Sequence, residues 1–151
     1  MKKLLLVVLV FSCNFINAQE DQIKNTIHTF FKGLHNGDTA LIATTIHKDL
    51  KLQTTFVNNE GNNVLKNELK ENFLKSIANK KKEDVWLENL LYFEISIDEN
   101  LASVWTPYEF YVNGSFSHCG ANSFQLFNNN GNWEIIFLVD SRRRKGCEIK
   151  E

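Results

Sequence analysis

Residues 101–140 contain the side chains whose types and spacing could do chemistry. Asn113-Gly114 lies between two alternating runs and predicts a β-hairpin with a two-residue turn. Counting outward from this turn places Glu109 opposite His118, on one face of the sheet. A carboxylate beside an imidazole can orient it as a general base or help it bind a ligand. The alternative is that the two groups satisfy each other and lock the sheet.

The same counting places Trp105 opposite Asn122, where the amide could hydrogen-bond a planar ligand stacked on the indole. The alternative for Asn122 is a structural bond to the backbone. Arg142 follows the last strand, and its guanidinium could bind a carboxylate at the mouth of a pocket. The residues predicted to contact a ligand are Trp105, Asn122, Tyr111, Phe124 and Arg142, and the predicted catalytic pair is His118 and Glu109.

Period-two alternation divides this stretch into two faces. The face with the candidate site is predicted to contain Trp105, Glu109, Tyr111, Phe116, His118, Asn122, Phe124, Leu126, Trp133, Ile135, Phe137 and Val139. The other face is predicted to contain Val104, Thr106, Tyr108, Phe110, Cys119, Ala121, Ser123, Ile136, Leu138 and Asp140. A single-residue bulge would exchange the faces beyond it, and Pro107, which lacks an N–H, is one position where this could occur.

Charge and composition exclude several other functions. The formal net charge is −1, which gives no electrostatic basis for binding nucleic acid or an anionic membrane surface. His28 and His35 lie seven residues apart on one helical face, but a metal site needs three or four converging ligands. The chain has no phosphate-binding glycine loop and no serine-nucleophile elbow. We therefore predict no metal and no cofactor.

The helices that must position the site follow from periodicity and capping. Residues 21–34 predict a helix with an apolar stripe made by Ile23, Ile27, Phe30 and Leu34. Asp38 is predicted to cap a short helix that ends near Ala43. Asn67 is predicted to cap a third helix over residues 68–79.

Alternating runs after and between these helices predict strands. The expected ranges are residues 50–57, 85–97, 101–112, 115–127 and 132–140. Within residues 85–97, one face is predicted to carry Leu87, Asn89, Leu91, Phe93, Ile95 and Ile97. Helices followed by a long antiparallel run are typical of an α+β domain, in which helices pack on one side of a curved sheet. We expect a single domain over residues 19–151.

The first 18 residues have the pattern of a secretory signal peptide. Lys2 and Lys3 precede the apolar run from Leu4 to Phe11, and Ala18 offers a small residue for cleavage. The alternative is lipidation at Cys13. We expect the protein to be exported, as a periplasmic or secreted protein with no membrane attachment after cleavage.

Export leaves two cysteines, Cys119 and Cys147, in the mature chain. An even number of cysteines in an exported protein permits a disulfide. The alternative is a buried free Cys119 and a free Cys147 near the carboxyl terminus. The sequence leaves the two alternatives open.

Two groups of motifs resemble a known superfamily. They are Asp21–Asp38 (DQIKNTIHTFFKGLHNGD) and the later set Ala102-x-Val-Trp, Tyr108-x-Phe110, Ser117-His118-Cys119-Gly120, Phe124-x-Leu126, Gly131-x-Trp133 and Asp140-x-Arg142. Over residues 20–147 the chain is similar to the nuclear transport factor 2-like superfamily, in particular to an exported bacterial branch with lumazine-binding or polyketide-cyclase-like members. The resemblance implies a cone-like fold of three N-terminal helices packed on a strongly curved, mostly antiparallel sheet.

The resemblance also implies an interior pocket and a homodimer through the outer sheet face. The expected contacts of this dimer are Tyr108, Phe110, Ile136 and Leu138. It implies no particular reaction, because the superfamily contains enzymes and non-enzymatic members. We expect an exported protein that binds a small apolar or planar ligand. The alternative is an isomerase-, dehydratase- or cyclase-like enzyme that uses His118 and Glu109.

Overall fold

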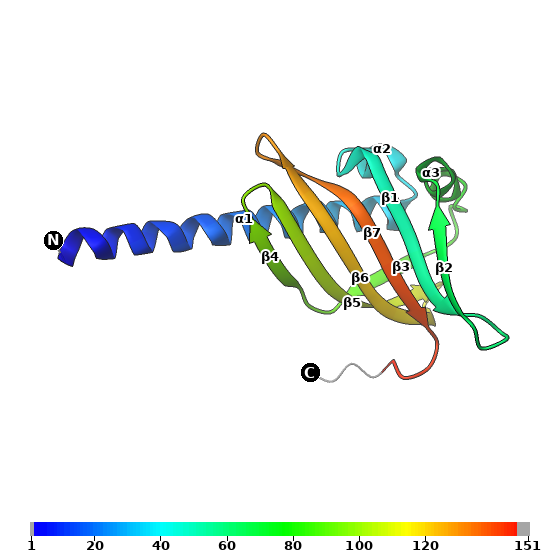
Figure 1. Ribbon diagram of the computed structural model, residues 1–151. Helices are drawn as coiled ribbons and strands as arrows, with labels where there is room; N and C mark the ends of the chain where they lie inside the picture. The colour runs from blue at the N-terminus through cyan, green and yellow to red at the C-terminus, as the bar shows by residue number, and fades with distance from the viewer. Residues whose placement is uncertain (1, 148–151) are drawn as a thin grey trace.

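The computed structural model describes the backbone of residues 2–147 and the side chains of residues 18–147 (Figure 1). The helices are α1 (Lys2–Asn36), α2 (Thr39–Ala43) and α3 (Lys70–Ala78). The strands are β1 (Ile46–Val57), β2 (Asn63–Glu68), β3 (Trp86–Leu90), β4 (Glu94–Asp98), β5 (Leu101–Val112), β6 (Ser115–Asn129) and β7 (Asn132–Arg143). Apart from Ala18, the side chains that carry the signal-peptide prediction and the Cys13 alternative lie outside the described residues, and both stay predictions.

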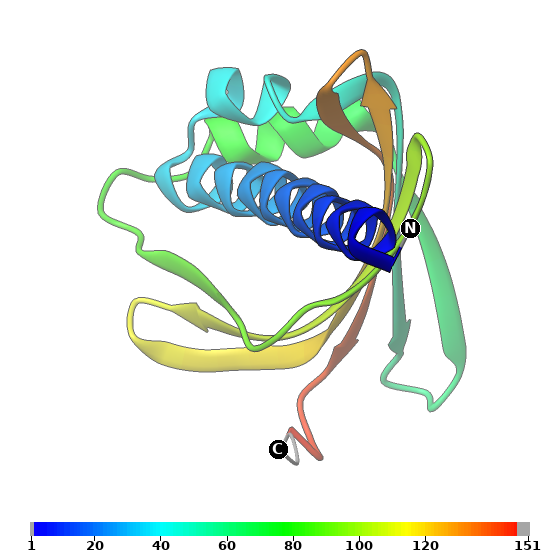
Figure 2. The same cartoon turned by 90° about the vertical axis from the view of Figure 1, so that its left-hand side faces the viewer.

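The seven strands form one sheet in the order β2-β1-β7-β6-β5-β3, with β4 also paired to β5. Of the strand pairs in residues 2–147, β1 with β7 is parallel and the others are antiparallel. The sheet bends strongly around α1, and all three helices lie on its inner side (Figure 2). The predicted α+β cone with a mostly antiparallel sheet is confirmed.

The core lies between the inner face of the sheet and the stripe predicted on α1. Ile23, Ile27 and Phe30 are fully buried there, and the buried Phe31 widens the stripe. Phe124 of β6 meets the rings of Phe30 and Phe31 edge to face, at 6.4 Å and 6.2 Å. Full burial of each such side chain stabilises the fold by about 1.5–3 kcal/mol. This packing holds α1 against the sheet, and α1 in turn forms one wall of the interior.

The prediction for the second helix is confirmed, and the prediction for the third is wrong at its start. The carboxylate of Asp38 accepts a hydrogen bond from Leu41 N at 2.9 Å and caps α2. Asn67 caps no helix, because residues 63–68 form β2 along the edge of β1. An open edge of β1 would leave backbone N–H and C=O groups unpaired, and β2 satisfies them.

The hairpin turn at Asn113-Gly114 forms as predicted, but the register beyond it differs. Both residues have positive φ, 53° and 77°, and the turn sets Val112 opposite Ser115. Ser117 is then an extra residue in β6, so that Tyr111 pairs with Phe116 and Phe110 with His118.

This bulge makes two predicted cross-strand pairs wrong. Glu109 lies opposite Cys119, and Trp105 lies opposite Ser123. The inner face of β5 is therefore formed by the even-numbered residues, among which Ala102, Val104, Thr106 and Tyr108 are buried. The physical reason is the period of two in a strand, since one inserted residue exchanges its faces.

A second irregularity changes the faces of β7. Leu126 pairs with Ile135 and Gln125 with Phe137, so Ile136 is the extra residue. Trp133 and Ile135 are buried as predicted. Beyond the bulge, however, the buried residues are Leu138 and Asp140 rather than the predicted Phe137 and Val139.

The expected outer face is corrected by the same two bulges, since Tyr108 and Leu138 are buried and Phe110 lines the interior. The predicted face of residues 85–97 is also wrong over β3. Leu87 is 47% exposed, whereas Trp86 and Glu88 point inward.

Pro107 causes neither bulge. It pairs with Ala121 inside β5, and its carbonyl accepts a hydrogen bond from Leu91 N at 3.0 Å. On that side of β5, β3 ends opposite Tyr108 and β4 begins opposite Trp105. The missing N–H of Pro107 therefore falls at the break between β3 and β4, where no ladder bond is lost.

Candidate functional site

A cavity of about 1320 Å³ lies between the helices and the bent end of the sheet. Its apolar wall comes from α1, α3 and β3. Phe30 of α1 and Phe73 of α3 stack with their ring centres 5.9 Å apart and almost parallel, and Trp86 of β3 also lines the space. The position of Trp86 is supported by Lys80 Nζ, which lies 5.7 Å from the centre of its ring. This wall can contact a flat apolar molecule.

The cavity lining also includes a carboxyl–amide pair. Asn122 of β6 donates a hydrogen bond from Nδ2 to Glu88 Oε1 of β3 at 2.7 Å. Burial raises the pKa of Glu88 to about 8, although the bond from Asn122 lowers it; the charge of Asp140 raises it further. Glu88 is therefore mostly protonated near neutral pH and can donate as well as accept a hydrogen bond.

Asp140 is the centre of a second polar cluster, and only 8% of it is exposed. Tyr108 Oη donates to Asp140 Oδ2 at 3.2 Å and lies 3.1 Å from the carbonyl of Ser141. Thr54 Oγ1 donates to Asp140 Oδ1 at 2.7 Å, and Arg142 Nε donates to Oδ2 at 2.5 Å. These donors compensate the buried negative charge, and they join β1, β5 and β7 at one point.

Gly120 makes this cluster sterically feasible. A Cβ atom at this position would lie 1.7 Å from the carbonyl oxygen of Ser141 and 3.0 Å from the ring of Tyr108. The first distance is a severe overlap with backbone, and the second is tighter than ordinary van der Waals contact. Glycine is therefore required where β7 and the Tyr108 ring approach β6.

His118 lines the same cavity as a neutral imidazole. Its ring lies 5.0 Å from the ring of Phe110 and meets Tyr108 edge to face at 5.7 Å. Nδ1 is 3.0 Å from Ser117 Oγ. Burial lowers the pKa of His118 to about 4, and the nearby charge of Arg142 lowers it as well.

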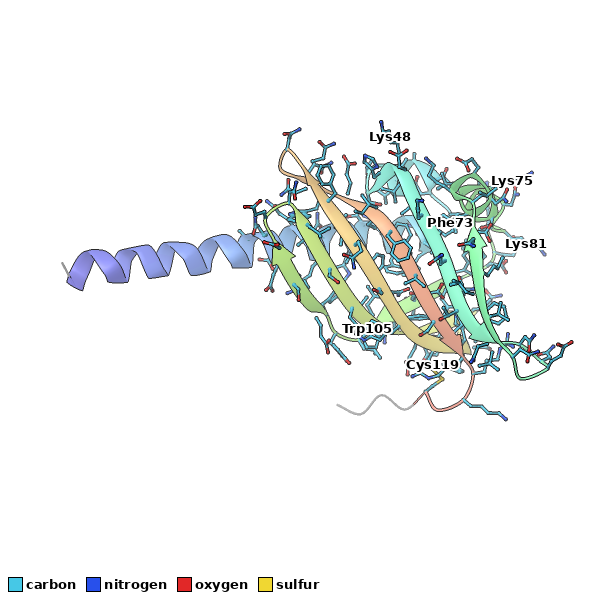
Figure 3. The ribbon with its side chains drawn as sticks, in the orientation of Figure 1. Lys48, Phe73, Lys75, Lys81, Trp105 and Cys119 are labelled. Atoms are coloured by element: carbon cyan, nitrogen blue, oxygen red, sulfur yellow. A yellow bond between two sulfur atoms is a disulfide. The ribbon has the colours of Figure 1, made fainter. Side chains whose placement is uncertain are left out.

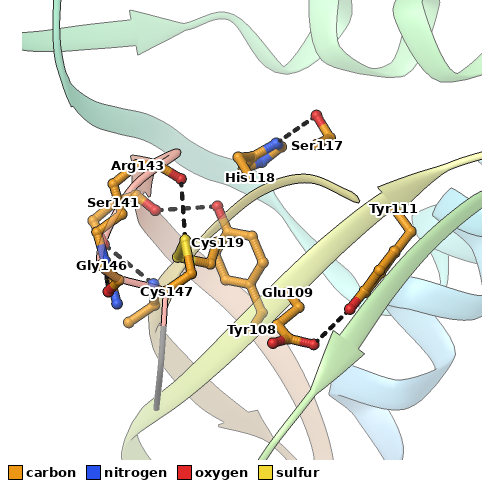
Figure 4. Close-up of a disulfide and its surroundings, with 11 residues drawn as sticks. Tyr108, Glu109, Tyr111, Ser117, His118, Cys119, Ser141, Arg143, Gly146 and Cys147 are labelled. Atoms are coloured by element: carbon orange, nitrogen blue, oxygen red, sulfur yellow. Dashed lines mark hydrogen bonds between the residues drawn. A yellow bond between two sulfur atoms is a disulfide. The ribbon is translucent and has the colours of Figure 1, made fainter. Parts of the chain in front are cut away.

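The structure brings together three of the seven residues predicted for the site: His118, Asn122 and Arg142 line the cavity. Phe124 is fully buried in the core. Trp105 is 43% exposed and lies on the outer side of β5. Glu109 accepts a hydrogen bond from Tyr111 Oη at 2.9 Å, away from His118 (Figure 4).

The sequence reasoning missed Glu88, Tyr108 and Asp140. Tyr108 and Asp140 were assigned to the outer face, because the count did not include the two bulges. Glu88 carried a usable signal, since in the strand WLENL it is an acid on the face that it shares with Trp86 and Leu90. An inward acid at that position must be neutralised or paired.

A disulfide joins Cys119 of β6 to Cys147, with their Cα atoms 5.8 Å apart (Figure 4). The sequence left open whether these two cysteines are bonded or free, and the structure shows that they are bonded. The bond holds the segment after β7 against the sheet. Arg143 at the end of β7 and Arg144 and Lys145 of this segment lie at the edge of the cavity.

The described side chains include no group of three His, Cys, Asp or Glu residues that could hold a metal ion. In the part of the chain whose structure is described, no helix is both long and apolar enough to cross a membrane.

Residues 18–138 match the protein family described as "Putative lumazine-binding". The chain belongs to this family. The match begins in the second half of α1 and ends within β7, so it includes α2, α3 and most of the residues that line the cavity. Among curated proteins, no significant relative is found.

Solved structures show that the family member has the nuclear transport factor 2-like fold. A nuclear transport factor 2-like protein from Cytophaga hutchinsonii superimposes with a TM-score of 0.66 at 16% identity, covering 83% of this chain and 98% of that one. A protein of unknown function from Mycobacterium tuberculosis gives 0.70 at 9% identity, covering 88% and 76%. The association domain of CaMKII from C. elegans gives 0.61 at 17% identity, covering 83% and 96%.

Proposed function

We propose that the protein binds a small planar ligand in the cavity, with an apolar ring system against the aromatic wall and a polar edge against Glu88 and Asn122. The observation that carries this proposal is the bonded pair of Glu88 and Asn122, which lines the same cavity as Phe73 and Trp86. A protonated carboxyl and an amide offer both donors and acceptors. The edge of a planar heterocycle presents the same two kinds of group.

The family description supports a ligand of this shape, because lumazine is a flat bicyclic heterocycle with N–H and carbonyl groups along its edges. The cavity is larger than one such molecule, in agreement with a ligand that carries a further substituent. The neutral His118 on the same wall adds one more polar contact.

The proposal is tested by titrating the purified protein with lumazine and a panel of planar heterocycles, with isothermal titration calorimetry as the readout. Asn122→Ala and Trp86→Leu are each expected to weaken binding by about tenfold or more, since each removes a central contact of about 1–2 kcal/mol. Trp105→Phe is the matched control on the outer face and should bind normally. If no compound of the panel binds to the wild-type protein, the proposal is wrong.

A second candidate function is proton transfer by Glu88, and the raised pKa of this group in a ligand-sized cavity favours it. The carboxylate of Glu88 would remove a proton from a carbon next to a carbonyl group, the electrons of the C–H bond would move onto the carbonyl oxygen, and the carboxyl group would return the proton to another carbon. Glu109 has no part in this step, because it lies outside the cavity.

Deuterium uptake from D₂O by a cyclic ketone, followed by NMR, tests this candidate. Exchange should rise with pH through the pKa of about 8 and fall by about 10²–10⁴-fold in Glu88→Gln. Glu109→Gln should exchange like the wild-type protein. Equal exchange in Glu88→Gln and in the wild type would rule the residue out as the base.

Two further features of the protein belong to this proposal. The apolar run at residues 4–11 and the disulfide, which needs an oxidising compartment, support export. Leu87, Trp105 and Phe116 are exposed on the outer side of the sheet and support a homodimer through that face. The name of the C. elegans relative, an association domain, agrees with assembly in this superfamily. Cell fractionation with mass analysis of the mature chain tests export.

A further inference from the structure

Positive charge gathers on one side of the cavity. Among the lining residues, Lys66 is paired with Glu68 at 2.9 Å, and Arg142 is paired with Asp140. Arg143, Arg144 and Lys145 also line the cavity, and within residues 18–147 they take part in no ion pair. Three cations therefore stand at the mouth of a cavity in a protein whose net charge is only −1.

The interior of the cavity does not offset this charge. The charge of Asp140 is paired with that of Arg142, and Glu88 is mostly protonated. The neutral His118 adds no charge. A ligand that fills the space would therefore have an uncharged inner environment and a cationic outer one.

The disulfide determines where these cations lie. Cys147 is bonded to Cys119, which is fully buried in β6, so the segment after β7 turns back toward the sheet (Figure 4). Arg143 Nε donates to the carbonyl of Gly146 at 3.1 Å and stabilises this turn. Because both ends of the segment are held, its side chains stay at the mouth rather than moving freely.

We propose that Arg143, Arg144 and Lys145 form an anion subsite at the mouth, and that the ligand carries a negatively charged group at the end that faces them. This inference rests on the proposed binding of a planar ligand in the cavity and names its chemical class, a flat apolar molecule with a carboxylate, sulfonate or phosphate substituent. The disulfide is a positioning device for the subsite.

Two fluorescent probes with the same aromatic skeleton test the subsite. N-phenylnaphthylamine is uncharged, and anilinonaphthalene sulfonate adds one anionic group. We expect the wild-type protein to bind the sulfonate about tenfold more tightly at low salt, and to lose most of this preference in about 0.5 M NaCl, because exposed charges are screened. A triple variant, Arg143→Gln, Arg144→Gln and Lys145→Gln, should bind the two probes equally.

A matched triple variant controls for net charge. Lys75→Gln, Lys81→Gln and Lys82→Gln remove the same charge at α3 and the loop after it, and none of these residues lines the cavity. Figure 3 shows Lys75 and Lys81 near α3, apart from Cys119 at the lower end of the sheet. This variant should keep the preference for the sulfonate. Loss of the preference in both triple variants would overturn the subsite, since it would then reflect overall charge.

Reduction tests the positioning role. Treatment with dithiothreitol, or the variant Cys147→Ser, should abolish the preference for the sulfonate and leave the uncharged probe bound as before. Near-ultraviolet circular dichroism shows that the domain is still folded, because loosely packed states also bind such dyes but lose this signal. If the uncharged probe binds and the sulfonate is never preferred, the subsite is wrong and the cavity proposal stands. If neither probe binds to the wild-type protein, the cavity proposal itself fails.

Discussion

Glu88 links the protonation of the cavity to the stability of the fold. Its pKa is raised to about 8 in the folded protein, from 4.5 for an exposed glutamate. Between these values the folded state holds a proton that the unfolded state has lost. The stabilisation is therefore complete below about pH 4.5 and is lost as the pH rises through 8.

The variant Glu88→Gln is expected to remove this dependence. Its amide cannot titrate and can still bond to Asn122, so above pH 6.5 its free energy of unfolding should fall less steeply than that of the wild type, by about 1 kcal/mol per pH unit. The window of pH 6.5–8 is chosen because His118, with its pKa lowered to about 4, has the opposite effect below 6.5. Urea unfolding at several pH values measures the difference, and parallel curves would contradict the raised pKa.

Gly120→Ala should be strongly destabilising. The new methyl group would overlap the Ser141 carbonyl, and neither backbone strand can move without disturbing Tyr108 and Asp140. We expect a loss of about 3 kcal/mol, at the upper end for overpacking. Chemical denaturation measures it, with Ala121→Gly as the control in the neighbouring position, where about 1 kcal/mol is expected.

At the scale of elements, the disulfide closes a loop that contains the β6–β7 hairpin, since the two cysteines are 28 residues apart. By the chain-entropy relation, removal of the bond should lower the free energy of unfolding by about 3–4 kcal/mol. Thermal unfolding of Cys147→Ser, compared with the oxidised wild type, measures the loss. An unchanged melting temperature would mean that the bond restrains only the segment after β7.

Local signals in the sequence predicted the elements well. The stripe on α1, the cap at Asp38 and the turn at Asn113-Gly114 each depend on residues close together in the chain, and all three are confirmed. The predicted start of the third helix was wrong, because residues 63–68 pair with β1 as a strand. No local pattern in the sequence identifies β1 as their partner.

The candidate site depends on register, and the bulges at Ser117 and Ile136 determine it. A bulge arises where a curved sheet needs extra twist, which is a property of all the strands together rather than of any one segment. His118 and Asn122 were placed on the inner face correctly. Glu109 and Trp105 were placed wrongly, because the bulge at Ser117 pairs His118 with Phe110 and Asn122 with Thr106 instead.

At the scale of the whole molecule, the outer side of the sheet is the surface that we expect to pair two copies of the chain. Trp105 and Phe116 are 43% and 45% exposed there. A charge in the middle of an apolar interface is costly, so Trp105→Asp should turn a dimer into a monomer in sedimentation experiments. Trp86→Leu changes a tryptophan inside the cavity and should leave the oligomeric state unaltered. A wild-type monomer at micromolar concentration would contradict the proposal.

The parallel pairing of β1 with β7 has a consequence for how the protein folds. Thr54 and Asp140 meet although they lie 86 positions apart in the chain, whereas β5, β6 and β7 follow one another through short turns. Closing a long loop is slow, so the three-stranded meander should form before β1 joins it and completes the polar cluster. This order predicts a kinetic φ-value near zero for Leu52→Ala in β1 and one near one half for Phe124→Leu in β6. The binding cavity would then be the last part of the molecule to exist, and a nascent chain could hold no ligand before its carboxyl-terminal strand is in place.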